Sequence, residues 1–372
     1  MGYQTIILDI GQFSSKTGFG GEDQPTNVFF TLVGEPKYQQ VDLTFQEQGG
    51  TELFVGNEIS DAMGLYKISH PIRKGRIQDW NYFEKIIEYI FYNLRVDPVV
   101  ANVLYAVHPL CPKEEKRKLF EIFIEKYNCY SFYPVLDSML TLYSGGFQTG
   151  LIVEIGDSST RLVPVYEGFQ LAHAIKVIDL GGSTITDFME HKLKEKGFTA
   201  DSSVKKHLTR VIKEKACFTS LDLKEDLNRV KEYSKSFSLP DGEIMVVDEL
   251  RFMVPELLFD PTLFNLEIPP LHEAIMECIE ECDVDVRPKL LNNIFLSGGS
   301  SMFPNLKSRI YQELELLLAK KKKKEQMIRI IAPRERMFSV WIGGSILAMI
   351  PEFSDNWITR DKYYSGGIPE NL

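Results

Sequence analysis

The sequence lacks the features of a membrane or nucleic-acid-binding protein. Its longest apolar stretch, residues 341–350, is interrupted by glycine and falls short of the roughly 18–20 residues that span a bilayer. Positive charge is in deficit, because 42 Lys and Arg stand against 52 Asp and Glu and give a net charge of −10. Since binding to a phosphate backbone needs clustered positive charge, we expect no nucleic-acid partner and no membrane insertion.

Cysteine is also scarce, with five residues and no CxxC pair. An odd count, and a start without the basic residues and cleavage site of a signal peptide, predict reduced thiols in a cytoplasmic protein. Cys278 and Cys282 are four residues apart, which would place both on one face of a helix. We interpret them as packing residues rather than metal ligands.

Three common active-site motifs are missing. No Gly-Lys dipeptide occurs, which excludes a Walker A loop, and no GxGxxG follows a predicted strand, which argues against a Rossmann dinucleotide site. The HExxH pattern of zinc proteases is missing as well, since His272-Glu273 is followed by Ala274-Ile275-Met276. Any phosphate site in this chain must therefore use another device.

What the sequence contains is a regular alternation of strands and helices. Apolar runs that end in glycine-containing turns predict strands near residues 5–11, 151–156, 176–182 and 295–301. Apolar residues at helical spacing predict helices over 82–94, 113–127, 184–196, 203–216 and 304–318. Residues 33–67 are polar and glycine-containing and predict a small, looser subdomain. This alternation is typical of an α/β fold whose sheets are covered by helices.

Two segments of the chain match each other. The order acid-Ile-Gly-x-x-Ser-hydroxyl-base runs from Asp9 to Lys16 and again from Glu154 to Arg161. The two copies are about one domain length apart. We interpret the repeat as two duplicated domains, each of which offers one strand–turn–strand loop to a shared cleft.

The residue types of this repeat suit a polyphosphate and its metal. Glycine lets the backbone approach a ligand, successive amides in a turn bind anions, and Lys16 and Arg161 add positive charge. Asp9 and Glu154 cannot bind phosphate, but carboxylates at these positions can hold the water shell of Mg²⁺. Two ordinary β-hairpins are the alternative interpretation; they explain either turn alone better than they explain the match.

The sequence resembles actin and its relatives over nearly its whole length. The most specific motif is the run from Ser339 to Ala348, SVWIGGSILA, which is typical of the eukaryotic branch. The other motifs are His70-Pro71-Ile72 with Trp80, Leu142-Tyr143 with Gly150, Val165-Tyr166-Glu167-Gly168, Ile212-Lys213-Glu214-Lys215, Leu239-Pro240-Asp241-Gly242 and Leu296-Ser297-Gly298-Gly299.

The resemblance implies an actin-like ATPase fold: two duplicated lobes, four subdomains, and ATP or ADP with Mg²⁺ or Ca²⁺ in a central cleft. Subdomain 1 would comprise residues 1–32, 70–144 and 339–372, and subdomain 2 would comprise residues 33–69 with a mobile loop at 37–52. Subdomain 3 would comprise residues 145–180 and 270–338, and subdomain 4 would comprise residues 181–269.

The resemblance also implies a set of site residues. The phosphates would be held by Gly11, Gln12, Phe13, Ser14, Lys16, Gly156, Asp157, Ser158, Ser159 and Thr160. The nucleoside would be surrounded by Gly182, Arg210, Lys213, Glu214, Gly298, Gly299, Phe303 and Met337. Asp9, Asp137 and Glu154 would contact the metal through water, and Asp137, Glu154 and Arg161 would act in hydrolysis.

Three of these residues depart from the family pattern. Asp137 stands where the family has Gln to orient the attacking water, and the shorter acid puts its reach in question. Glu154 replaces an Asp near the metal. Arg161 replaces a His, where it either stabilises the transferring phosphate or pairs with Asp137 and inactivates both. The sequence leaves both interpretations of Arg161 open.

Other departures concern the first turn and the base. Gln12 and Phe13 replace Ser and Gly, and because Phe13 disfavours a positive φ, we expect this turn to differ in detail. Phe303 and Met337 replace Tyr and Lys beside the base, and Lys74 replaces a His. These changes favour a divergent homologue over a conventional actin.

The resemblance further implies assembly with other copies of the chain. The predicted loop at 37–52 corresponds to the segment that filaments of the family insert into the next subunit, and its apolar residues are Tyr38, Val41, Leu43 and Phe45. A groove at Tyr143, Ile342, Ile346 and Ile350 would receive this loop or an actin-regulatory protein. A head-to-tail contact of this kind does not close, so it generates a filament.

The interpretation favoured by the sequence is a cytoplasmic, cytoskeletal ATPase that assembles head-to-tail into filaments. The alternative is a non-polymerising actin-related subunit of a larger complex that binds ATP with little hydrolysis. A sugar kinase or chaperone of the same superfamily is disfavoured, because the chain has the eukaryotic-type run at 339–348 and no substrate-binding extension.

Overall fold

The computed structural model describes residues 3–37, 53–59, 64–198, 203–238, 244–322 and 326–369, without the side chains of residues 203–205. The chain divides into two compact units, the first formed by Met1–Gly146 with Phe338–Leu372 and the second by Phe147–Met337. Apart from Lys37, the loop predicted at 37–52 lies outside the described residues. The finer division into four subdomains stays a prediction.

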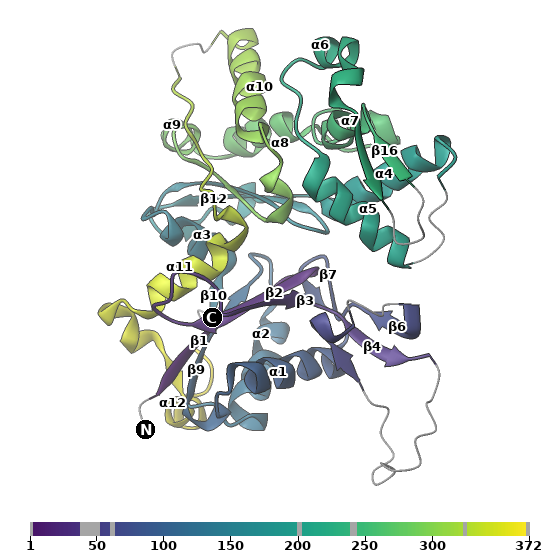
Figure 1. Ribbon diagram of the computed structural model, residues 1–372. Coiled ribbons are helices and arrows are strands. Elements are labelled where there is room, and N and C mark those ends of the chain that lie inside the picture. The colour runs from purple at the N-terminus through teal and green to yellow at the C-terminus, as the bar shows by residue number, and fades with distance from the viewer. Residues whose placement is uncertain are drawn as a thin grey trace. The chain divides into compact units, whose positions relative to one another are not determined.

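The first unit contains a larger and two smaller groups of strands with their helices (Figure 1). Its strands are β1 (Gln4–Ile10), β2 (Ser14–Phe19), β3 (Asn27–Phe30), β4 (Val33–Pro36), β5 (Phe54–Val55), β6 (Tyr66–Ser69), β7 (Ile72–Arg73), β8 (Arg76–Ile77), β9 (Ala101–Val107), β10 (Ser131–Leu136) and β19 (Ile358–Thr359). Its α-helices are α1 (Trp80–Leu94), α2 (Lys113–Phe120), α3 (Asp137–Ser144), α11 (Ser339–Ala348) and α12 (Arg360–Gly366). The helix predicted over 113–127 is α2 continued by a π-helical segment, η4 (Glu121–Lys126).

The main sheet of the first unit has the strand order β19-β10-β9-β1-β2-β3. β1 is antiparallel to β2 and parallel to β9, so the β1–β2 hairpin lies inside a mixed sheet. Successive side chains of a strand point to opposite faces. Accordingly, Ile6 packs into the core formed with α1 and α2, whereas Ile7 packs with Trp341 of α11. Figure 1 shows α1 and α2 on one side of these strands and α3 and α11 on the other.

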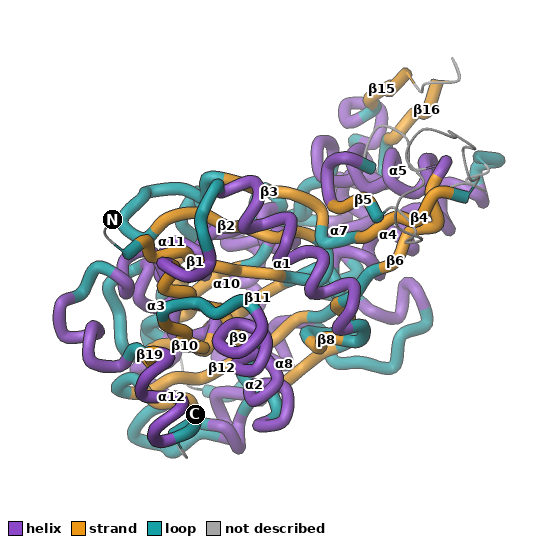
Figure 2. The backbone as a smooth tube through the Cα atoms, turned by 90° about the horizontal axis from the view of Figure 1, so that it is seen from below, coloured by secondary structure: helices purple, strands orange, loops and turns teal. Residues whose placement is uncertain are grey.

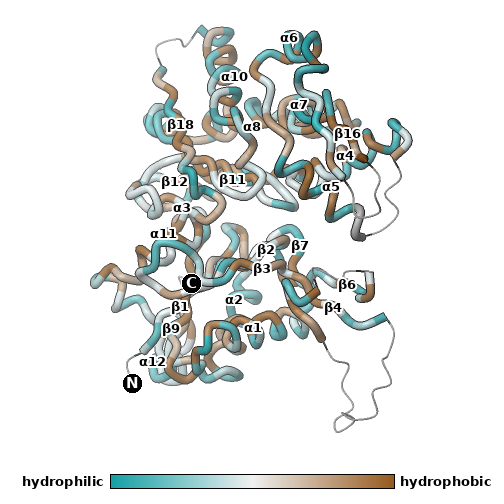
Figure 3. Tube along the Cα trace, in the orientation of Figure 1, coloured by the Kyte–Doolittle hydropathy of each residue, from teal (hydrophilic) through white to brown (hydrophobic). Residues whose placement is uncertain are grey.

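Helix α1 shows why the amphipathic pattern predicted a helix here. Its N-cap residue Asp79 accepts a hydrogen bond from the Tyr82 amide at 3.0 Å, and Arg95 ends the helix in the left-handed conformation. The buried side chains recur at helical spacing, and Figure 3 shows hydrophobic and hydrophilic residues alternating along α1. Beside it, β4, β5 and β6 form a separate three-stranded sheet (Figure 2).

The glycine pair of the run from Ser339 to Ala348 serves a helix crossing. A Cβ built on Gly343 would lie 1.7 Å from the carbonyl oxygen of Leu140 in α3, and one built on Gly344 would lie 2.7 Å from the Ile7 side chain. Next to them, the Trp341 indole donates a hydrogen bond to the Ile7 carbonyl at 3.2 Å. The most specific motif of the sequence is therefore the surface that seats α11 on α3 and β1.

The second unit carries its own sheet, a hairpin and a larger share of helices (Figure 1). Its strands are β11 (Gly150–Ile155), β12 (Thr160–Tyr166), β13 (Phe169–Gln170), β14 (Lys176–Ile178), β15 (Lys235–Ser238), β16 (Ile244–Val247), β17 (Ile294–Ser297) and β18 (Ile330–Ile331). Its α-helices are α4 (Gly182–Glu195), α5 (Ser203–Ala216), α6 (Leu223–Asn228), α7 (Leu250–Glu256), α8 (Leu271–Glu281), α9 (Arg287–Leu291) and α10 (Leu306–Lys320), and a 3-10 turn, η8, spans Gly299–Met302. Along all described parts of both units, no helix is long and apolar enough to cross a membrane.

The sheet of the second unit repeats the plan of the first. Its order is β13-β12-β11-β17-β18, with β14 also paired to β12. β11 is antiparallel to β12 and parallel to β17, as β1 is to β2 and β9. The inward residues of β11 pack with α4, α8 and α10 in one core, where Cys278 and Cys282 are buried as predicted. The duplication expected from the sequence repeat is thus present in strand order and direction.

Candidate functional site

The first turn, residues 11–14, closes the β1–β2 hairpin. The amide of Gly11 donates to the carbonyl of Ser14 at 3.2 Å. Asp9 faces Lys16 across the two strands, with Nζ and Oδ2 3.4 Å apart and side chains only 16% and 14% exposed. Lys16 Nζ also donates to the Ser14 carbonyl at 3.4 Å. The Lys16 ammonium group thus interacts both with Asp9 at the strand end and with the backbone of the turn.

Gln12 and Phe13 fit this turn without strain. Phe13 is not among the described residues with positive φ, and its ring packs on Phe30 with centroids 5.1 Å apart. The side-chain carbonyl of Gln12 accepts the amide of Lys74 at 2.9 Å, and Lys74 itself takes a φ of 49°. The left-handed backbone conformation is therefore adopted by Lys74 in the β7–β8 turn, and not by Phe13 in the first turn.

Asp137 is the first residue of α3, and 7% of it is exposed. An acidic side chain at this end of a helix interacts favourably with the helix dipole. Asp9, Asp137 and the residues of the first turn all belong to the first unit. The described residues contain no group of three or more His, Cys, Asp or Glu side chains arranged to hold a metal ion directly.

The second turn, residues 156–159, repeats the first one in the second unit. The amide of Gly156 donates to the carbonyl of Ser159 at 3.0 Å, as Gly11 does to Ser14. Glu154 faces Arg161 in the same register in which Asp9 faces Lys16. Here the guanidinium forms both an ion pair and a hydrogen bond with the carboxylate, and the two side chains are 13% (Arg161) and 16% (Glu154) exposed.

Helix α4 is anchored to the second turn by its first amides. Gly182 donates to the carbonyl of Gly156 at 2.9 Å, and Ser183 donates to that of Asp157 at 2.8 Å. The hydroxyl of Ser300 reaches the Gly156 carbonyl from η8, also at 2.8 Å. A Cβ at Gly182 would lie 2.5 Å from that hydroxyl, so a larger residue here would displace the Ser300 side chain from the turn. These contacts fix the turn between α4 and η8.

Helix α5 supplies two cations to the same place. Arg210 forms an ion pair with Asp157 of the second turn. Lys213 Nζ donates to the Gly182 carbonyl at 2.7 Å and to the Thr186 hydroxyl at 2.9 Å, with only 3% of the residue exposed. Burial, and then the neighbouring charge of Arg210, lower the pKa of Lys213 to about 8. Glu214 is more exposed, and its carboxylate is 3.9 Å from Arg210 Nε.

The turn after β17 completes this part of the second unit. Gly298 has a φ of 87°, and a Cβ there would lie 2.4 Å from the carbonyl of Ile155. Gly299 differs, because a Cβ on it would meet no atom within 4 Å. Phe303 is buried, and Arg336 donates to the Ser301 carbonyl at 2.7 Å, which brings the segment before Met337 to this turn. No described atom therefore fills the space beside the Gly299 Cα.

The structure thus brings the predicted residues together in two groups, one in each unit. The second unit gathers the second turn with Gly182, Arg210, Lys213 and Gly298 through the contacts above, and Phe303 lies in the core of the same unit. The prediction missed Ser183, Thr186, Ser300 and Arg336, which bind these elements to one another. Only Ser300 had a sequence signal, since it directly follows Gly298-Gly299.

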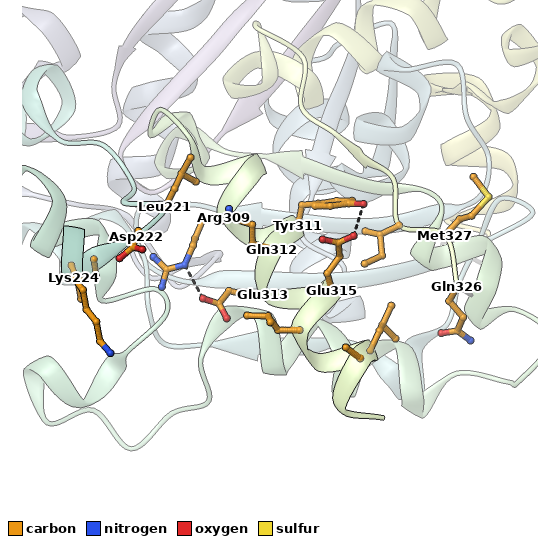
Figure 4. Close-up of a pocket in the computed structure, with 15 residues that line it drawn as sticks. Leu221, Asp222, Lys224, Arg309, Tyr311, Gln312, Glu313, Glu315, Gln326 and Met327 are labelled. Atoms are coloured by element: carbon orange, nitrogen blue, oxygen red, sulfur yellow. Dashed lines mark hydrogen bonds and ion pairs between the residues drawn. The ribbon is translucent and has the colours of Figure 1, made fainter. Parts of the chain in front are cut away.

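A separate cavity of about 1030 Å³ lies along α10 in the second unit (Figure 4). It is lined by residues 221–224, by residues of α10 between Arg309 and Ala319, and by residues 326–328. In Figure 4, Arg309 points to Glu313 and Tyr311 points to Glu315. None of the predicted nucleotide residues lines this cavity.

Each unit thus has a sheet of the same plan, with a glycine turn and an acid–base pair at its strand end. The family model described as Actin matches residues 2–369 of the chain. The chain therefore belongs to the actin family, and its α/β fold is that of the family. Membership in the family supports ATP binding. Proteins of the family typically bind a nucleotide together with a divalent cation.

Proposed function

We propose that this protein binds ATP with Mg²⁺, hydrolyses it slowly, and assembles head-to-tail into cytoplasmic filaments. The observation that carries the proposal is the repetition of one turn, with the same backbone hydrogen bond and the same acid–base register, in both units. A single hairpin of this kind would be unremarkable in any protein. Two copies at equivalent places in duplicated sheets favour one ligand with several phosphates.

The phosphates are assigned to the backbone amides and hydroxyls of the two turns, with Lys16 as a counter-charge. The nucleoside is assigned to the open space at Gly299, near Phe303, and to the α5 side chains Arg210, Lys213 and Glu214. Gly182 and Gly298 are assigned to the same site, and at Gly298 a Cβ would also meet the backbone of Ile155. The donors of the two turns suit the phosphates, and Phe303, which is 6% exposed, borders this site from within the core.

The metal is assigned to the carboxylates of the first unit. Asp9 lies at the strand end and Asp137 at the start of α3, and Mg²⁺ keeps most of its waters while using one or two carboxylates. A bound Mg²⁺ would supply charge neutralisation for the phosphates. Asp137 would accept a hydrogen bond from the attacking water and orient it.

Assembly is assigned to the exposed apolar side of α11 and to the loop predicted at 37–52. In the groove predicted at Tyr143, Ile342, Ile346 and Ile350, Ile346 is 44% exposed and Ile350 is 39% exposed. Apolar residues exposed together favour a protein partner. The partner is a second copy of the chain or a regulatory protein. Within each copy, we propose the division into four subdomains given above.

A non-polymerising, weakly hydrolysing subunit is the second candidate. It is favoured by one observation: Arg161, a predicted catalytic residue, is hydrogen-bonded to Glu154. Sedimentation of the purified protein at tens of micromolar with Mg-ATP, with phosphate release measured in parallel, separates the candidates. A pellet with released phosphate supports the filament-forming ATPase. ATP binding without a pellet or phosphate supports the second candidate, and absence of ATP binding contradicts both.

A further inference from the structure

The pair formed by Glu154 and Arg161 differs in kind from its counterpart in the first unit. Both pairs occupy the same cross-strand register, next to the closing residue pair of the turn, and both are mostly buried. In the first pair, Lys16 Nζ lies 3.4 Å from Asp9 Oδ2 and donates a hydrogen bond to the Ser14 carbonyl of the turn at 3.4 Å. In the second pair, Arg161 donates directly to the Glu154 carboxylate. The acid of the second unit is therefore bound by its own cation.

The chemistry of the two cations explains the difference. Lysine is a compact point charge on a flexible stem, so it can divide its interactions between Asp9 and the turn. Arginine carries a planar guanidinium that matches a carboxylate and stays charged at any physiological pH. A carboxylate that already accepts a charged hydrogen bond is a weaker acceptor for the waters of a metal ion. Glu154 is thus poorly suited to the metal role that Asp9 retains.

We propose that Arg161 is the built-in cation of the second turn and that Glu154 is its counter-ion rather than a contact of the metal's waters. The carboxylates that contact the waters of the divalent ion then come from the first unit alone. ATP binding depends less on the metal than it would if both Asp9 and Glu154 contacted the metal's waters. This inference rests on the proposed ATP binding by the two turns. It leaves Asp9 and Asp137 in the roles given above.

The test compares ATP affinity in Mg²⁺ with ATP affinity in EDTA, measured by calorimetric titration of the full chain. The informative variant is Glu154→Gln, because an amide oxygen still accepts a hydrogen bond from Arg161 while the negative charge is lost. If Glu154 is a counter-ion, removing its charge strengthens ATP binding about tenfold in both buffers, the scale of one charge-assisted hydrogen bond. For Glu154→Gln, the ATP affinity in Mg²⁺ divided by the ATP affinity in EDTA stays the same as for the wild type.

Asp9→Asn is the matched control in the first unit. Since Asp9 faces the metal in this scheme, its substitution weakens binding in Mg²⁺ and lowers the ratio about tenfold. A similar fall in the ratio for Glu154→Gln would overturn the inference. Thermal unfolding of each variant without nucleotide verifies that the two substitutions leave the chain folded.

Arg161→Gln gives the opposite shift. It removes the cation and exposes the charge of Glu154, so ATP binding weakens in EDTA by about tenfold or more and is partly restored by Mg²⁺. The double variant Glu154→Gln with Arg161→Gln returns the ratio to within about twofold of the wild type, because neither charge remains. An Arg161→Gln chain that binds ATP as the wild type does contradicts the inference. Absence of ATP binding by the wild type in Mg²⁺ would instead refute the proposed function itself.

Discussion

Gly343 of α11 lies against the backbone of Leu140 in α3, so closely that a Cβ at position 343 would be 1.7 Å from the Leu140 carbonyl oxygen. The neighbouring Trp341 is fully buried and holds the same helix on β1 through its hydrogen bond to Ile7. This crossing places α3, and with it Asp137 at the first position of that helix, relative to the strand that carries Asp9.

The crossing predicts a strong effect of one methyl group. Gly343→Ala must push α11 away from α3, and we expect the free energy of unfolding to fall by about 1–3 kcal/mol or more, as overpacked cores do. Chemical denaturation monitored by tryptophan fluorescence measures the loss. Gly366→Ala in α12 is the matched control, because a Cβ there would meet no atom within 4 Å. Equal stability of both variants would contradict the geometry of the crossing.

The position of Lys16 predicts that its substitution lowers the affinity for ATP while the chain stays folded. Lys16→Met removes the positive charge that contacts Asp9 and the Ser14 carbonyl, and we expect ATP affinity to fall by about ten- to a hundredfold. Titration calorimetry in Mg²⁺ measures the change. Lys85→Met serves as control, since Lys85 pairs with Glu88 on the exposed side of α1. Unchanged affinity of the Lys16 variant would remove this lysine from the phosphate site.

Lys213 predicts a dependence of stability on pH. Its pKa is lowered to about 8 in the folded chain, mainly by burial, from an ordinary value of 10.5. Between these values the unfolded chain binds more protons, so the free energy of unfolding rises with pH in this window, by on the order of 3 kcal/mol from this residue. Below pH 8 the lysine is charged in both states and contributes no slope.

The variant Lys213→Met isolates this contribution. Thiols and tyrosines that titrate in the same range are common to both proteins, so they cancel in the difference between wild type and variant. Urea unfolding at pH 7 and pH 10 measures it. If the free energy of unfolding changed equally between pH 7 and pH 10 in the wild type and in Lys213→Met, Lys213 would have an ordinary pKa in the folded chain.

The exposed side of α11 predicts a separation of assembly from nucleotide binding. Ile346→Asp places a charge in the predicted groove, and we expect the pelleted fraction at tens of micromolar to fall at least about tenfold, because an unpaired charge is costly in an apolar contact. ATP affinity is expected to stay unchanged. Tyr92→Asp, on the exposed face of α1, is the control for a surface charge. Normal pelleting of the Ile346 variant would place the assembly contact elsewhere.

The sequence determined the strand–turn–strand repeat, the α/β class and the family, because these depend on local patterns and on ordered motifs. Glycine, acid and base recur at fixed offsets, and a hairpin register follows from such offsets once the turn length is set. The residues of both turns could therefore be named from the repeat, whereas those of α5 were named only through the resemblance to the family.

Only the tertiary structure decided what those residues contact. The sequence left Arg161 between a phosphate and Asp137, and it did not foresee the ion pair that Arg161 forms with Glu154 across the hairpin. The resemblance named Gly182 beside the nucleoside, and only the structure shows that a Cβ there would lie 2.5 Å from the Ser300 hydroxyl, from a turn more than a hundred residues away. The physical reason is the same in both cases: local spacing fixes backbone conformation, but the partner of a side chain is set by which distant segment packs beside it.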